Sequence, residues 1–151
     1  MRTFDVQTVP LDCPASEAFS FIAAPENLPR WTHAFAEARP GKARMHTPAG
    51  EAEIALEVIA SDARGTIDWN MSFPDGTTGW AYSRVVPTGP RSCAYSFVLL
   101  APPVPLEQLE GALEQQSATL RRELHTLKNL LGGDSAPGTN AAPIPRAGAE
   151  R

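Results

Sequence analysis

The sequence predicts an α+β domain in which an antiparallel sheet of about seven strands is covered by one long C-terminal helix. From residue 33 to residue 100, apolar side chains recur at every second position between closely spaced turn signals, which is typical of antiparallel strands. After residue 105, leucines recur every three or four positions, which is the period of a helix with one apolar face. A sheet with one apolar face needs a cover, and a single long helix supplies it.

The length and the net charge of the chain indicate a single domain and argue against a nucleic-acid-binding protein. The chain has 151 residues, of which 42% are hydrophobic, so it is long enough for one domain with a sizeable core. Its formal net charge is −4, and its Lys and Arg residues are scattered. A protein that binds the phosphate backbone needs a concentrated basic surface, so we expect no nucleic-acid partner.

The sequence also indicates a location and argues against metal sites. No apolar run approaches membrane-spanning length, and residues 4–9 alternate instead of forming a signal-peptide core, so we expect no membrane span and a cytoplasmic protein. Cys13 and Cys93 lie far apart in sequence without ligand spacing, which favours a reduced pair. His46 and His125 have no carboxylate or second histidine at ligand spacing, so we expect neither a metal nor another cofactor.

The first part of the chain predicts a strand followed by two short helices. Residues 3–9 alternate as a strand does. The next segment reads PASEAFSFIAAPENLPRW from Pro14 to Trp31, and its apolar residues repeat at helical spacing. Pro14 suits the first turn of a helix, and Pro25 stops the helix because proline cannot donate the next hydrogen bond.

The rest of the chain predicts the sheet, its cover and a tail. The strongest strand patterns are 53–58 and 67–73, each with one apolar and one polar face. The leucines from Leu106 to Leu131 predict one helix of about 26 residues; a coiled coil has the same spacing, but the sheet favours a cover. Residues 132–151 are rich in Pro, Gly and Ala, so we expect a disordered tail after a domain of residues 1–131.

The segment from Pro14 to Trp31 resembles the N-terminal signature of the START-like, or SRPBCC, superfamily, which includes polyketide cyclase/dehydrase and lipid-transfer proteins. The signature is roughly a proline, an apolar helical pair and then ADPENLPRW. Here Ala24 replaces a frequent aspartate and Ala18 a frequent valine. The resemblance covers residues 2–131 and implies a helix-grip fold, in which a strongly curved sheet wraps around the C-terminal helix and leaves a functional cavity between them.

We next assign strand faces. On the last strand, Tyr95 and Phe97 should face the helix because they alternate with serines. On the preceding strand, the family's alternation puts the small set that includes Ala81 inside and leaves Trp80 and Tyr82 outside, where a partner subunit can cover them. A register shifted by one residue would instead place these two aromatic residues in the core.

The inward residues define the predicted ligand cavity. It comprises Trp31, Phe35, Met45, Leu56, Trp69, Met71, Ala81, Ser83, Tyr95, Phe97, Leu109, Leu113, Gln116 and Leu120. Gln116 interrupts the leucine face, so it is either a polar group at the cavity wall or an exposed glutamine with Ser117 in the inward position. Tyr95 is the one inward proton-transfer candidate that this assignment supports, although the usual role of a buried tyrosine is in the core.

These patterns lead to three functional hypotheses. The first is binding of a small hydrophobic or amphipathic ligand between the sheet and the helix. The second is an enzyme of the polyketide cyclase/aromatase type that uses the same cavity. The third is a dimerising interaction module that associates through Trp80 and Tyr82. The sequence favours binding, because a cavity is predicted while recognisable catalytic motifs are missing.

Overall fold

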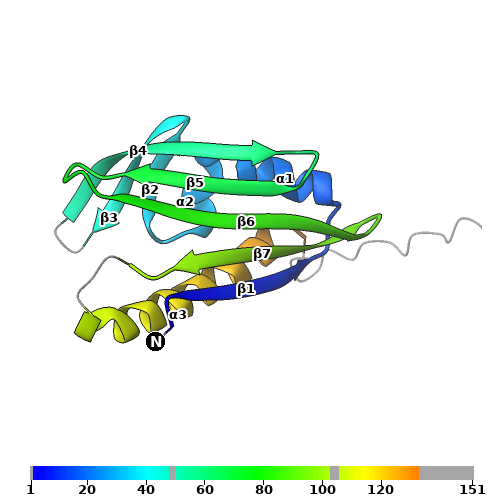
Figure 1. Ribbon diagram of the computed structural model, residues 1–151. Coiled ribbons are helices and arrows are strands. Elements are labelled where there is room, and N and C mark those ends of the chain that lie inside the picture. The colour runs from blue at the N-terminus through cyan, green and yellow to red at the C-terminus, as the bar shows by residue number, and fades with distance from the viewer. Residues whose placement is uncertain (1, 48–49, 103–105, 133–151) are drawn as a thin grey trace, which may run out of the picture.

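An antiparallel sheet forms one layer of the molecule, and the helices lie against one of its faces (Figure 1). The structure is a computed structural model that describes residues 2–47, 50–102 and 106–132, and the side chains of 106–110 lie outside the described part. The elements in chain order are β1 (Phe4–Leu11), α1 (Ala15–Ala23), the 3-10 turn η1 (Pro25–Asn27), α2 (Leu28–Trp31), β2 (Phe35–Arg39), β3 (Gly41–Thr47), β4 (Gly50–Ser61), β5 (Thr66–Ser72), β6 (Thr78–Gly89), β7 (Ser92–Leu100) and α3 (Leu106–Leu130).

The strand order is β1-β7-β6-β5-β4-β3-β2, with every neighbouring pair antiparallel. The strands from β2 to β7 form a simple meander, whereas β1 pairs with β7 at the far edge. The chain passes between the two edges through α1, η1 and α2. The predicted seven-stranded sheet, short helices and long C-terminal helix are confirmed. The predicted tail lies, apart from Gly132, outside the described residues.

The register fixes which face each side chain occupies. Ala81 lies opposite Trp69, and Trp80 lies opposite Asn70 on the other face. Directly opposed residues share a face of an antiparallel pair, so the small residues of β6 point toward α3 with Trp69. Trp80 and Tyr82 are both 38% exposed, as the unshifted register predicts.

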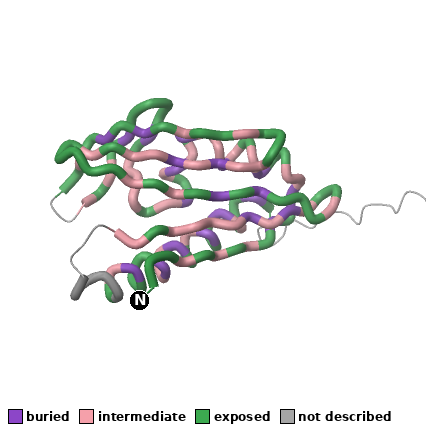
Figure 2. The backbone as a smooth tube through the Cα atoms, viewed as in Figure 1, coloured by how far each residue is buried: buried purple, intermediate pink, exposed green. Residues whose placement is uncertain are grey.

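The core lies between the sheet and the helices (Figure 2). The leucines of α3 that pack into it are Leu113, Leu120, Leu124 and Leu127, and Leu131, directly after the helix, is also buried. The amide of Gln7 on β1 donates a 2.8 Å hydrogen bond to the carbonyl oxygen of Ser117 and so ties the helix to the sheet edge. No helix in the described part of the chain has both the length and the hydropathy of a membrane span.

The turn between β4 and β5 depends on Gly65. Its φ is +74°, a left-handed conformation that a side chain disfavours, and its carbonyl oxygen accepts a 2.8 Å hydrogen bond from the Val85 amide. A Cβ atom at this position would lie 2.2 Å from the carbonyl oxygen of Val85. Gly76, in the turn between β5 and β6, has a similar φ of +89° but no atom within 4 Å of such a Cβ.

Substitutions at these two glycines can distinguish the cost of backbone strain from the cost of a steric clash. We expect Gly76→Ala to lower the free energy of unfolding by about 1 kcal/mol, because only the backbone is strained. Gly65→Ala should cost about 3 kcal/mol or more, because the new methyl group also displaces β6. Urea unfolding of both variants tests this comparison, and equal losses would contradict the close approach of Val85.

Candidate functional site

A cavity of about 830 Å³ opens between the inner face of the sheet and the middle of α3. Its sheet side is apolar, with large side chains from β3, from β5 and the residue after it, from β7 and from the α2–β2 region. These include Trp31, Phe35, Met45, Trp69, Met71, Phe73, Phe97 and Leu99. Its helix side is mainly polar and consists of Ala112, Gln115, Gln116, Thr119, Leu120 and Glu123. The cavity therefore has an apolar wall on the side of the sheet, and the opposite wall, on α3, can form hydrogen bonds.

The structure brings most of the predicted cavity residues together. Trp31, Phe35, Met45, Trp69, Met71, Ala81, Phe97, Gln116 and Leu120 line the cavity. Leu56, Ser83, Tyr95 and Leu113 are buried and lie outside its lining. Leu109 lies on α3 in the stretch whose side chains are not described. Gln116 is exposed and lines the cavity, while Ser117 takes the buried position.

Small residues on β6 create the space. Gly79 and Ala81 line the cavity opposite the large side chains of Met71 and Trp69 on β5. A Cβ at Gly79 would meet the Met71 side chain at 3.6 Å, which is ordinary contact distance. Protein interiors are normally close-packed, so this unfilled strip leaves room for a guest molecule.

An aromatic cluster supports the cavity from behind. The ring of Tyr95 lies edge-on to that of Trp31, with centroids 6.3 Å apart, and Phe97 stacks on Trp69 at 5.8 Å. The Tyr95 hydroxyl and the indole nitrogens of both tryptophans are buried without a hydrogen-bond partner among the described residues. Burial raises the pKa of Tyr95 well above its ordinary value, and the neighbouring Ser83 hydroxyl opposes only part of this shift. Tyr95 is thus a protonated core residue in this structure.

Glu123 is the carboxyl group at the cavity, and it was not among the residues predicted from the sequence. One of its oxygens accepts a hydrogen bond from the backbone N–H of His33, which also lines the cavity. Burial raises the pKa of Glu123, while this hydrogen bond and the charges of His33 and Arg122 oppose the rise. The signal was present, because Glu123 follows Gln116 and Thr119 at helical spacing.

Other reactive groups lie away from the cavity. Cys13 and Cys93 are free and buried side by side, and burial is the main cause that raises the pKa of Cys13 to about 12. Burial also raises the pKa of Cys93, so both thiols stay protonated and are poor nucleophiles. Within the described residues, no group of three or more His, Cys, Asp or Glu side chains has the geometry to hold a metal ion.

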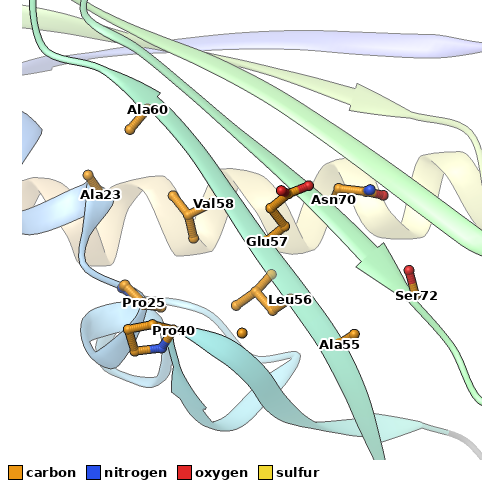
Figure 3. A pocket seen from close by; sticks show the side chains of 11 residues that line it. Ala23, Pro25, Pro40, Ala55, Leu56, Glu57, Val58, Ala60, Asn70 and Ser72 are labelled. Atoms are coloured by element: carbon orange, nitrogen blue, oxygen red, sulfur yellow. The ribbon is translucent and has the colours of Figure 1, made fainter.

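A second hollow, of about 690 Å³, lies where β4 and β5 meet the start of β3 and the α1–η1 junction (Figure 3). Figure 3 shows Leu56 near Pro25 and Pro40, whereas Glu57 lies beside Asn70. Consecutive strand residues point to opposite faces of a sheet, so a lining that includes both Leu56 and Glu57 wraps around the sheet. This hollow is a surface groove, and the cavity beneath α3 is the stronger candidate site.

Comparison with solved structures identifies the fold. A START superfamily protein from Mycobacterium smegmatis superposes with a TM-score of 0.63 at 18% identity, over 86% of this chain and 99% of that one. The Zhui aromatase/cyclase from Streptomyces sp. R1128 superposes with a TM-score of 0.58 at 11% identity, over 86% of this chain and 91% of that one. The di-domain aromatase/cyclase BexL of the BE-7585A biosynthetic pathway superposes with a TM-score of 0.64 at 17% identity, over 85% of this chain and 46% of that one.

No family model and no curated protein sequence matches the chain. At these identities the structural likeness describes the fold alone. The fold is START-like, as the segment from Pro14 to Trp31 predicted.

The burial of Glu123 predicts a pH-dependent effect on stability. Its pKa is higher in the folded than in the unfolded state, so its favourable contribution to folding is present at low pH and is lost as the pH rises through the folded-state pKa. We therefore expect Glu123→Gln to raise the melting temperature at pH 7.5 and to change it little at pH 4. Thermal unfolding at both pH values tests this, with Glu114→Gln, exposed on the same helix, as the control. An equal change at both pH values would contradict the assignment.

Proposed function

We propose that the protein binds a small hydrophobic or amphipathic molecule in the cavity between the sheet and α3. The observation that carries this proposal is the unfilled apolar wall. Phe35, Met71 and Phe97 are only partly buried although they point to the inner face of the sheet, because they border the cavity. A ligand that covers such surface gains about 25 cal/mol per Å² of apolar area removed from water.

The polar wall would set the orientation of the ligand. The amide groups of Gln115 and Gln116 and the Thr119 hydroxyl can each donate and accept hydrogen bonds. A few polar groups opposite a large apolar surface are the usual composition of a small-molecule site. We also propose a cytoplasmic location, which suits the adjacent free thiols of Cys13 and Cys93.

A polyketide cyclase/aromatase activity is the second candidate function. The observation in its favour is the position of Glu123 at the cavity. A carboxyl group of raised pKa at a largely apolar cavity is a candidate proton-transfer residue. Tyr95, the group that the sequence suggested for this role, lies behind the cavity lining. Two of the structural neighbours described above carry the name aromatase/cyclase, which makes this activity a reasonable one to assay.

Binding can be tested with N-phenyl-1-naphthylamine, a neutral aromatic dye whose fluorescence rises in apolar surroundings. We expect saturable binding at one site in the wild type. Gly79→Leu should weaken it at least about tenfold, because the new side chain fills the strip beside Met71. Val86→Leu adds apolar bulk to the outer face of the same strand and is the matched control.

A folded wild type that shows no saturable binding would overturn the proposed function. Equal binding by the Gly79→Leu variant would show that the dye binds elsewhere. Turnover of an aromatic polyketide-type substrate by the wild type would instead favour the cyclase.

Association through the outer face of the sheet is a third proposal. Trp80 and Tyr82 stack there at 5.8 Å with their rings 5° from parallel, and the exposed apolar side chains Val6 and Leu100 extend this surface across β1 and β7. These four side chains are uncharged and form an exposed apolar surface, which a second copy of the chain can cover.

Sedimentation velocity can test this association. We expect a dimer in the wild type and a weakening of at least about tenfold when Trp80→Ser removes the stacked ring. Ile59→Ser, which removes another exposed apolar side chain on the same face, from β4, should have a smaller effect. A wild type that stays monomeric at a protein concentration of about 100 μM would contradict the proposal.

A further inference from the structure

The charges around the cavity are one-sided. Among the described residues that line it, Glu123 is the one carboxylate, and none is Lys or Arg. The chain contains no Lys or Arg between Arg91 and Arg121, so the part of α3 before residue 121 brings no cation to this wall. A ligand that enters the cavity therefore meets an acidic group with no Lys or Arg in the lining, and the basic side chains there are the imidazoles of His33 and His46.

Glu123 also keeps capacity to accept hydrogen bonds. A carboxylate has two oxygens and about four lone-pair positions. The His33 N–H is the one donor to Glu123 seen in the described part of the chain. The side chain therefore has acceptor positions left for a ligand.

The neighbouring charged and titratable groups do not cancel this acidity. The charge of His33 opposes the rise in the Glu123 pKa, but burial has the larger effect. The exposed guanidinium group of Arg122 donates a 3.3 Å hydrogen bond to the Thr119 hydroxyl, and Arg122 lies outside the lining. His46 is exposed at the cavity rim, where its Nδ1 lies 3.5 Å from a carboxylate oxygen of Glu51. The indole N–H groups of Trp31 and Trp69 are buried away from the open volume and present no donor to an anion.

We propose that the cavity selects hydrophobic ligands whose polar end is a hydrogen-bond donor, cationic or uncharged, and that Glu123 accepts this end. This inference rests on the proposed binding function and narrows its ligand class. A carboxylate or sulfonate on the ligand would face Glu123 at close range in surroundings of low dielectric, where like charges repel strongly. An amine or hydroxyl group would instead form a charge-assisted hydrogen bond with the carboxylate.

The test uses two competitors with the same ring system and opposite charge, 1-naphthylmethylamine and 1-naphthylacetate. Each displaces N-phenyl-1-naphthylamine from the wild type at pH 8 and low salt. We expect the amine to displace the dye at a concentration at least about tenfold lower than the acid, which reflects one charge pair at the cavity. Raising the salt concentration should narrow this ratio without any mutation.

Glu123→Gln should reduce the preference for the amine to about threefold or less, because it removes the charge and keeps an acceptor. Glu114→Gln changes the net charge equally on an exposed part of the same helix and should leave the ratio unchanged. If the dye binds but the acid competes as well as the amine, or if Glu123→Gln leaves the preference intact, the charge selection is wrong while the binding function stands. If the dye does not bind, the proposed function itself fails.

Discussion

The packing of the α3 leucines against the inner face of the sheet is the interaction on which the rest of the structure depends. Leu120, Leu124 and Leu127 are each at most 4% exposed, and they fix the C-terminal half of the helix to the core. Burying such a side chain contributes about 1.5 to 3 kcal/mol, so these contacts outweigh any single polar contact of the helix. Gln7 adds a directional bond at the edge strand and sets the position of the helix along the sheet.

The cavity lies where this packing gives way to polar residues. Along the middle of α3, Gln115, Gln116 and Thr119 lie at the cavity in place of leucine. On the opposite wall, β6 presents Gly79 and Ala81, so neither side fills the gap. The C-terminal half of α3 thus packs against the core, and its middle lines the cavity. The same helix contributes both to stability and to the candidate site.

The sequence allowed the fold to be predicted because period-two strands, a leucine-faced helix and the Pro14–Trp31 segment agreed. The inner face of β6 also followed from alternation, since a strand has only two faces. The position of Tyr95 behind the lining could not be predicted, because alternation gives the face of a residue and not its depth. Glu123 was missed although it follows Gln116 and Thr119 at helical spacing, because a charged residue on a helix is usually solvated. The hydrogen bond from the His33 N–H, which depends on the path of the chain, is not visible in the sequence.

The pairing of β1 with β7 has a consequence for the order of folding. The hairpins from β2 to β7 join strands that are close in sequence, whereas Phe4 pairs with Leu100 across nearly the whole domain. Closing so long a loop costs more chain entropy than forming a hairpin, and contacts of high sequence separation slow folding. During synthesis on the ribosome, β1 leaves first yet must wait for β7, so the first strand made is among the last to find its partner.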